Sequence, residues 1–364
     1  MSEKFVKKVF IVLWFLPVMI VIVSLAVTSY YNNLISEVNF NSDVIEVVEN
    51  EFNKESVVIS EPPEITLMAV GDIMLSRHVG TKIVEADDYT LPFINIWEEL
   101  MIANITIGNL ESPFYDQGLR VTQGMSFKAE PEAIAGLQLA GFDVLSLANN
   151  HTMNQGTKGL EYTLDYLIKN DIETIGAGLD FDQAHTSVII ETEDMTFGFL
   201  GYSYADYRDV AGQKYVVAGL DVKQAKKDII AIREEADVVV IVMHAGIEYV
   251  TEPNWQQENF ARGVIDAGAD LVIGHHPHWP QIVEEYKDKW IFYSLGNFVF
   301  DQEWSQETKE GLILKAVWQE KELQRLELIP VIIENYSTPR LANEQEKNKI
   351  LSQIGLDNEI IFEQ

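Results

Sequence analysis

Short apolar runs alternate with amphipathic stretches from residue 65 onward. The runs are rich in β-branched and aromatic residues and too short for helices, which is typical of buried strands, and the stretches between them have helical spacing. This alternation predicts an α/β domain. The predicted strands are 65–70, 104–109, 143–149, 196–202, 237–244, 269–275 and 289–297, and the predicted helices are 131–140, 156–170, 221–235 and 252–267.

Two further apolar runs follow near the end of the chain, at 311–319 and 323–333. The polar residues Glu320 to Glu322 separate them, so the pair predicts a β-hairpin. A hairpin after the α/β pattern indicates a second sheet. We therefore expect one folded domain over 64–335 and a helical tail over 336–364.

The first residues have a different pattern. Three lysines precede an uncharged run over 9–28, which is about the 20 residues that a transmembrane helix needs. Basic residues stay on the cytoplasmic side. We therefore expect a cytoplasmic tail over 1–8, a single-pass membrane anchor over 9–28 and an extracytoplasmic main domain. A cleaved signal peptide is the alternative, because Ser24 and Ala26 are small residues that a signal peptidase accepts.

The stretch 29–63 is polar and acidic, has no sustained period and ends in Glu61, Pro62 and Pro63. This composition indicates a stalk or linker between the anchor and the domain.

Charge and cysteine content exclude several kinds of function. The chain has 26 Lys and Arg against 57 Asp and Glu, a formal net charge of −31, which argues against a nucleic-acid partner. An anionic substrate would need a local cationic centre, which a metal ion or Arg77 could supply. There is no cysteine, so disulfides, thiolate metal ligands and a cysteine nucleophile are excluded.

The strongest candidate site lies in the stretch 269–281, where an apolar run stops at Gly274 and three histidines follow. Imidazole binds divalent first-row metals. In an extended segment residues i and i+2 share a face, so we expect His276 and His278 to converge while His275 faces away. The alternative is a polar loop whose histidines only cap a strand.

Polar side chains follow most of the other predicted strands, at the edge where ligands bind in open α/β sheets. Carboxylate, amide and imidazole donors together suit Mn, Fe, Zn or Co better than Ca or Mg. So many donors could hold one or two ions, and a pair of ions activates water for attack on a phosphoryl group. These residues are Asp72, Asn109, Glu111, Asn150, His151, His244, Glu248 and Asn297.

Six motifs resemble, in this order, those of the CapA (poly-γ-glutamate capsule biosynthesis) family: GDIMLSR, GNLESP, NNHTMNQG, HAGIEY, GHHPHWPQ and SLGNF. The resemblance covers about residues 65–300. The family's fold is similar to that of calcineurin-like metallophosphatases, which implies a four-layer α/β/β/α sandwich after the transmembrane helix. It also implies a role in making, exporting or anchoring poly-γ-glutamate at the cell surface, beside membrane-bound polymer synthase or ligase subunits.

The resemblance also implies roles for single residues. The implied metal ligands are Asp72, Glu111, Asn150, His244, His276 and His278. The implied catalytic residues are His151, which would protonate a leaving group, Arg77, which would hold an anionic oxygen, and Glu248. The residues implied to support the ligands or contact the substrate are Asn109, Gln281 and Asn297.

Two departures from the metallophosphatase pattern bear on the number of ions. Asp72 is followed by Ile73 and Met74 and not by the usual Asp-x-His, so one expected ligand is missing. Asn154 stands where the family often has an acid. One metal ion is therefore a safer prediction than two.

Several candidates have simpler interpretations. Arg77 and Glu248 would each form a surface ion pair, and Asn109 and Asn150 would only satisfy hydrogen bonds of the loop backbone. Three tryptophans near the predicted opening of the site would pack in the core or at the rim, and the alternative is that they stack on a substrate. His78 and His185 fall outside the pattern and are read as surface residues. The three tryptophans are Trp255, Trp279 and Trp304.

Three hypotheses follow from the sequence. The first is a membrane-anchored protein of poly-γ-glutamate or capsule biosynthesis with a metal site. The second is a metal-dependent phosphoesterase or other hydrolase of the cell envelope, acting on an anionic polymer or a phosphoester. The third is a non-catalytic scaffold with a decayed site, which the near-complete ligand set disfavours. Fold resemblance by itself does not prove hydrolysis.

Overall fold

The computed structural model describes residues 62–205 and 216–364. Residues 62–364 form one compact unit. The predicted cytoplasmic tail and anchor, and the predicted stalk up to residue 61, lie outside the described residues. In the part that is described, no helix is both long enough and apolar enough to cross a membrane.

Nine strands form the first sheet, in the order β16-β15-β14-β1-β2-β3-β4, with β13 paired to β1 and β17 paired to β15. From β1 to β4 the strands are parallel, and β14 to β16 are antiparallel. The bounds are β1 Ile65–Ile73, β2 Ile105–Leu110, β3 Val144–Ser146, β4 Glu173–Ile175, β13 Asn297–Val299, β14 Glu310–Gln319, β15 Glu322–Glu334, β16 Thr338–Leu341 and β17 Ile360–Glu363.

Six strands form the second sheet, in the order β11-β12-β10-β9-β7-β6, and β5 pairs with β8 in a small ribbon. The neighbours β7, β9, β10 and β12 run parallel. The bounds are β5 Ala177–Gly178, β6 Val188–Glu191, β7 Thr196–Ser203, β8 Val216–Val217, β9 Val238–His244, β10 Leu271–His275, β11 Val283–Tyr286 and β12 Lys289–Phe292.

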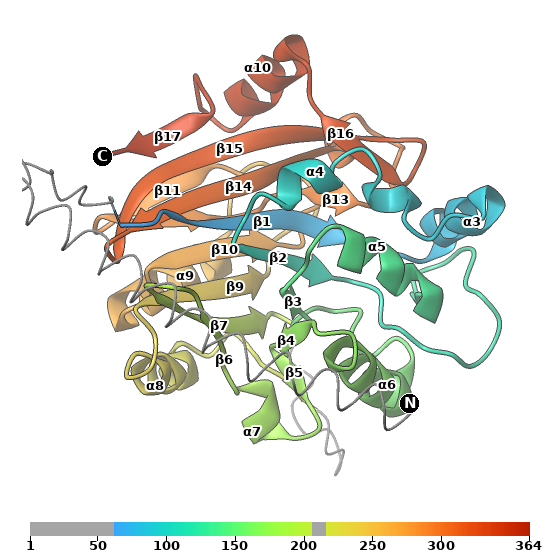
Figure 1. Cartoon of the computed structure of the whole chain (residues 1–364), viewed down its shortest axis with the longest axis horizontal. Helices are drawn as coiled ribbons and strands as arrows, with labels where there is room; N and C mark the ends of the chain where they lie inside the picture. Colours follow the sequence, from blue (N-terminus) through green and yellow to red (C-terminus); the bar gives the residue numbers. More distant parts are fainter. Residues whose placement is uncertain (1–61, 206–215) are drawn as a thin grey trace, which may run out of the picture. The chain divides into compact units, whose positions relative to one another are not determined.

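Most of the helices lie on the outer faces of the two sheets (Figure 1). Their bounds are α3 Arg77–Ala86, α4 Trp97–Leu100, α5 Ile134–Leu139, α6 Gly156–Ile168, α7 Phe181–Ala184, α8 Val222–Ile232, α9 Trp255–Ala267 and α10 Glu344–Gln353, with 3-10 turns η1 Leu91–Phe93, η2 Pro131–Ala133 and η3 Glu307–Lys309.

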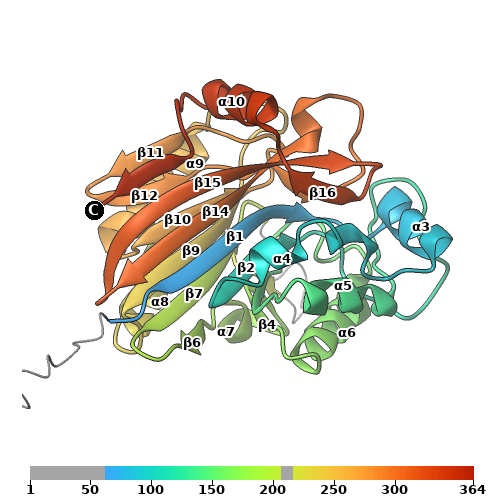
Figure 2. The same cartoon turned by 45° about the horizontal axis from the view of Figure 1, so that its top comes forward.

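The alternation of side chains along the strands produces four layers. Leu67 of β1 and Val240 of β9 belong to the apolar core between the two sheets. Their chain neighbours point the other way, so Met68 packs in the core under α3, α5 and α6, and Val239 packs in the core under α8 and α9. The layer order is therefore helix, sheet, sheet, helix (Figure 2), the sandwich that the sequence resemblance implied.

The late hairpin is present, but it does not form the second sheet. The chain turns between β14 and β15 at Glu320 and Lys321, whose φ angles are 51° and 69°. β14 pairs antiparallel with β1, so the hairpin extends the first sheet. The predicted second sheet is present, but the hairpin is not part of it. Ile313 and Leu314 face two different cores, as expected for a strand in the interior of a sheet.

The last residues are more than a helical tail. The stretch 336–364 contains the expected helix, α10, and two short strands, β16 and β17. Both strands pair with β15. This stretch is therefore part of the first sheet.

Candidate metal centre

The ends of four parallel strands bring the candidate ligands together. Asp72 near the end of β1 is in register with Asn109 of β2, and His244 at the end of β9 is in register with His275 of β10. The first pair belongs to one sheet and the second pair to the other. The candidate ligands therefore meet at the carboxyl edge of the sandwich, where such folds bind ligands.

One cluster of possible metal ligands contains Asp72, Glu111 and His244. Their ligand atoms lie within 4.8 Å of one another, and all three residues are buried. The Oε1 atom of Glu111 is 3.7 Å from the Nε2 atom of His244. Asn150 adds an oxygen, because its Oδ1 atom is 2.9 Å from the same Nε2 atom. This cluster joins both sheets.

A second cluster contains Glu248, His276 and His278, again with ligand atoms within 4.8 Å of one another. Asp72 connects it to the first cluster. The Oδ2 atom of Asp72 is 3.3 Å from the Nδ1 atom of His278 and accepts a hydrogen bond from the backbone N–H of His276. Glu248, which the sequence resemblance implied to be catalytic, therefore stands in a ligand position.

The donors present fit a divalent cation. Among the described residues, the buried Oε2 atom of Glu111 and the buried Nδ1 atom of His276 have no hydrogen-bond partner. An unpaired buried polar atom costs about 1–3 kcal/mol. A metal ion would satisfy such lone pairs, and mixed carboxylate and imidazole donors are those that Mn, Fe and Zn accept.

The pKa values of the two buried carboxyl groups also favour a bound cation. Burial raises the pKa of Asp72, but the imidazoles of His275 and His278 outweigh this and hold that pKa well below its ordinary value. Burial, reinforced by the charge of Asp72, raises the pKa of Glu111 well above its ordinary value. Two carboxylates so close together repel each other when both are ionised, and a bound cation would offset this repulsion.

The imidazoles are held neutral, which is the form that binds metal. Burial lowers the pKa of His244 well below its ordinary value, with the nearby His276 acting in the same direction. Burial also lowers the pKa of His276 to about 3. Both rings are therefore available as ligands at neutral pH.

The prediction that His275 faces away is wrong. His275 still belongs to β10, in register with His244, and its Nδ1 atom is 3.2 Å from Oδ1 of Asp72. His276 and His278 do converge, as predicted, but not through the alternation of an extended strand, because β10 ends at His275. His276 and His278 then have φ angles of 97° and 59°, so the backbone is no longer extended where they project.

His151 and Asn154 form a pair beside the first cluster. The Nδ1 atom of His151 is 2.9 Å from Oδ1 of Asn154, and its ring stacks on Phe127 with centroids 4.0 Å apart. Burial lowers the pKa of His151 to about 4, although the contact with Asn154 opposes this. His151 is therefore a neutral imidazole at pH 7 in the metal-free protein.

Asn109 and Asn297 contact predicted ligands. Asn109 donates a hydrogen bond of 2.8 Å to Oδ1 of Asp72, and Oδ1 of Asn297 is 2.9 Å from Nδ1 of His278. Gln281 is different, because its amide bonds to the side chain of Gln257 and to backbone oxygens of the loop that precedes α9. In this arrangement Gln281 orders a loop and does not contact the clusters.

Arg77 is engaged within the protein. Its guanidinium forms an ion pair with Asp301 and lies 4.6 Å from the centroid of Phe127, and its side chain is 13% exposed. Its Nη1 atom also donates to the backbone oxygen of Gly124. The simpler interpretation of Arg77 as a surface ion pair is wrong, because both partners are largely buried. Its role in holding a substrate oxygen stays a prediction.

The two histidines outside the motif pattern differ from each other. His78 is exposed, as expected. His185 is not a surface residue, because its side chain is 7% exposed and its Nδ1 atom is 2.8 Å from Oδ2 of Asp228. Tyr202 donates a hydrogen bond to the same oxygen. This buried network ties α7 to α8 and β7, so it supports the fold.

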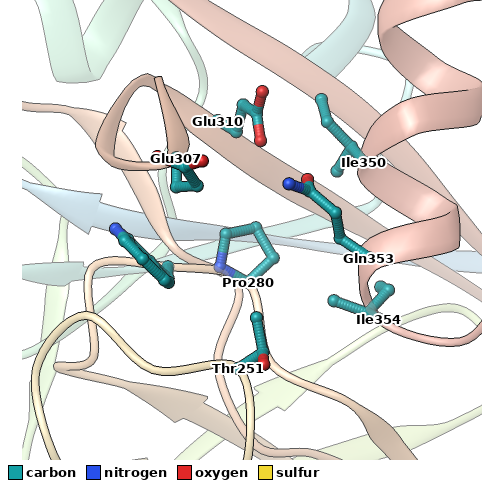
Figure 3. A pocket seen from close by; sticks show the side chains of 8 residues that line it. Thr251, Pro280, Glu307, Glu310, Ile350, Gln353 and Ile354 are labelled. Carbon is teal, nitrogen blue, oxygen red and sulfur yellow. The ribbon is translucent and has the colours of Figure 1, made fainter. Parts of the chain in front are cut away.

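The tryptophans near the site are also of two kinds. Trp255 and Trp304 are 75% and 60% exposed, and Trp304 lies edge-on to Tyr249 with centroids 4.6 Å apart. Trp279 instead lines a cavity of about 100 Å³ between the loop after His278 and α10 (Figure 3). Its other lining residues are Thr251, Pro280, Glu307, Glu310, Ile350, Gln353 and Ile354. No residue of the two ligand clusters lines this cavity.

Comparison with known proteins decides the family. The model of the family described as "Bacterial capsule synthesis protein PGA_cap" matches residues 66–302, which include every residue of both ligand clusters. The chain belongs to the PGA_cap family. The resemblance seen in the six motifs is therefore confirmed.

Relatives of this PGA_cap chain carry matching names. The Capsule biosynthesis protein CapA of Bacillus anthracis is 32% identical over 307 residues, covering 82% of this chain and 74% of that protein. The PGA biosynthesis protein CapA of Bacillus subtilis (strain 168) is 30% identical over 287 residues, covering 78% and 75%.

One solved structure also matches much of this chain at lower identity. A presumed 5′-nucleotidase from Staphylococcus aureus, in complex with alpha-ketoglutarate, has a TM-score of 0.45 and 17% identity. The match covers 80% of this chain and 58% of that one.

Some residues around the centre of this PGA_cap protein gave no sequence signal. Tyr204 packs on His276 with ring centroids 4.6 Å apart, and Phe300 lies edge-on to His278 at 4.8 Å. Asp301 binds Arg77 from 224 positions away in the chain. Phe300 and Asp301 directly follow β13 and begin two residues beyond the SLGNF motif, so extending the motif by three residues would have included them.

Proposed function

We propose that this chain is a membrane-anchored, extracytoplasmic protein of poly-γ-glutamate or capsule polymer biosynthesis that carries a divalent metal centre. The observation that supports it most is the pair of ligand clusters that Asp72 connects, within a chain of the PGA_cap family. The relatives named for capsule and PGA biosynthesis support the biological role.

The proposed ligands are those implied by the motifs, with Glu248 added. Asp72 would be available to either ion of a two-ion centre, because it belongs to the first cluster and its Oδ2 atom contacts His276 and His278 of the second. With Glu248 as an additional ligand, the absence of the Asp-x-His motif is no longer a reason to expect a single ion. A bound divalent ion would supply Lewis acidity and an activated water. The chain itself supplies neutral imidazoles, one ionised carboxylate and the amides that orient them.

Metal content of the purified full chain tests the centre. We expect one or two Mn, Fe or Zn ions per wild-type chain by mass spectrometry, and loss of them in a His276→Ala, His278→Ala variant. His185→Ala is the matched control, because it removes a buried histidine that lies outside the clusters. If the wild type takes up no Mn, Fe or Zn after incubation with each metal, the proposed centre is wrong.

The location and the partners belong to the same proposal. The uncharged run over 9–28 supports a single membrane anchor, with residues 1–8 in the cytoplasm. The proposed partners are membrane-bound synthase or ligase subunits of the polymer. With a net charge of −31, the chain would meet an anionic polymer through the metal centre, where a cation offsets the repulsion.

A second candidate function is a metal-dependent phosphoesterase or other envelope hydrolase. It is favoured by one observation, the position of His151 beside Asn150, which itself contacts His244. An imidazole in that place would donate a proton to a leaving group. The low pKa of His151 opposes this role, because the ring is unprotonated at pH 7.

Asn154→Asp tests the candidate hydrolase. A carboxylate beside Nδ1 should raise the pKa of His151 from about 4 by about 1–3 units, since an opposite charge favours the protonated ring. The pKa is measured by NMR titration of the metal-free protein, with Asn170→Asp at the end of α6 as the control. If His151 acts as a general acid, release of phosphate from an aryl phosphate by the Mn-loaded variant should also rise near neutral pH. An unchanged pKa would contradict the described contact.

A further inference from the structure

Arg77 lies at the centre of a stack of rings that connects two histidines of the site. Its guanidinium carbon is 4.6 Å from the centroid of Phe127 and 5.7 Å from that of Phe300. The Phe127 ring stacks on His151, with centroids 4.0 Å apart. The Phe300 ring lies edge-on to His278, with centroids 4.8 Å apart.

The two histidines reach this stack from different parts of the sandwich. His151 follows β3 of the first sheet, and His278 follows β10 of the second sheet. The two phenyl rings also contact each other edge-on, with centroids 6.0 Å apart. The stack therefore connects a histidine that follows a strand of the first sheet with one that follows a strand of the second.

Asp301 holds the guanidinium in this place. It forms an ion pair with Arg77 and also accepts a hydrogen bond of 3.1 Å from the backbone N–H of His78. The side chain of Asp301 is 3% exposed, so the pair is largely protected from water. Arg77 itself has a φ angle of 48°, and its backbone N–H donates to the oxygen of Val121. A residue fixed by so many contacts is suited to position others.

We propose that Arg77 is a positioning residue, which holds His151 and His278 at a fixed spacing through the rings of Phe127 and Phe300. Only a planar guanidinium can lie against two rings and bind a carboxylate at its edge, so lysine cannot replace it. The inference rests on the proposed function only for the tasks of the two histidines, since the stack is a property of the metal-free fold.

The test compares Arg77→Lys with Arg262→Lys in the full chain. Arg262 is a matched control, because it also pairs with a carboxylate, Glu284, and lies near a ring, Tyr286, on the outer side of α9. Lysine keeps the charge beside Asp301 and removes the planar contact. In metal-free protein, NMR should show that the ring signals of His151 and His278 shift in Arg77→Lys and stay in place in Arg262→Lys. The His185 signal should stay in place in both.

Metal affinity is the second readout. Titration with Mn²⁺ alone should give a dissociation constant about tenfold higher for Arg77→Lys than for wild type, and an unchanged one for Arg262→Lys. If Arg77→Lys does not fold, Phe127→Leu serves instead and should shift the His151 signal. Unshifted signals of both histidines in a folded Arg77→Lys variant would overturn the proposal. A wild type that binds no Mn²⁺ would refute the metal centre and leave the ring-signal test intact.

Discussion

Glu111→Gln should strongly weaken metal binding and at the same time stabilise the metal-free protein at neutral pH. Glu111 is fully buried beside Asp72, and burial together with that charge raises its pKa well above the ordinary value. Glutamine has the same shape and no charge, and its amide can donate to Asp72. It also removes an anionic ligand, so the affinity for Mn²⁺ should fall by about a hundredfold or more.

The pH dependence follows from the sign of this shift. A carboxyl group whose pKa is raised by folding stabilises the fold below its unfolded pKa of about 4.5, and this contribution is lost as the pH rises through the folded pKa. The melting temperatures of the two metal-free proteins should therefore be similar near pH 4 and diverge towards about pH 8, with the variant higher.

A matched control distinguishes this effect from a general effect of removing a buried acid. Glu310 is also buried, but it forms an ion pair with Lys349 at 2.7 Å. Glu310→Gln should therefore lower the melting temperature at neutral pH and leave Mn²⁺ binding intact. If the metal-free Glu111→Gln variant is instead less stable than the metal-free wild type at about pH 8, Glu111 and Asp72 do not repel each other as described.

Gly274→Ala should cost about 3 kcal/mol or more of folding free energy, because the added methyl group has no room. A Cβ atom at Gly274 would lie 2.0 Å from the backbone oxygen of Tyr293 and 2.5 Å from its carbonyl carbon. Both atoms belong to the backbone, so a change of side-chain rotamer cannot make room for the methyl group. The strand β10 and the segment after β12 would have to separate.

Chemical denaturation measures this cost, with Gly80→Ala as the control. Gly80 lies within α3, and a Cβ atom there would meet nothing closer than the Leu75 oxygen at 3.3 Å. Alanine at that place should change the free energy of unfolding by less than about 1 kcal/mol. The Gly274 variant should also bind Mn²⁺ more weakly, because the displaced segment leads to Asn297, which contacts His278. A Gly274→Ala protein as stable as wild type would contradict the close approach of the two segments.

The strands that deliver the site could be predicted because their signal is local. β1, β2, β9 and β10 are apolar runs that end in polar residues, and parallel strands place such ends at one edge. The short strands β4, β5 and β8 have two or three residues each and no such signal. Their positions depend on neighbours that only the folded chain provides.

The spacing predicted correctly that His276 and His278 converge, but not that His275 also faces the site. The rule of alternating faces needs an extended backbone, and His276 and His278 both have positive φ angles. Such angles are uncommon for residues other than glycine, and no sequence pattern marks them at a histidine. The same limit applies to Arg77, whose partner Asp301 comes from the other end of the domain.

The division of strands between the sheets was also beyond the sequence. The hairpin was recognised from its two apolar runs, but its partner strand, β1, is about 250 residues earlier in the chain. Long-range pairing of this kind depends on which faces of a strand must be buried, and β14 is buried on both of its faces.

The order of the proposed ligands along the chain determines at which stage of synthesis a metal ion could bind. Asp72 and Glu111 are made early, whereas His276 and His278 come about two hundred residues later, and β14, which completes the pairing of β1, follows them. A chain that emerges from its amino terminus therefore has no complete ligand cluster until most of the domain has emerged. Metal loading of the proposed centre would then be a late step of maturation, and the ion bound would be one present in the compartment where the domain finishes folding.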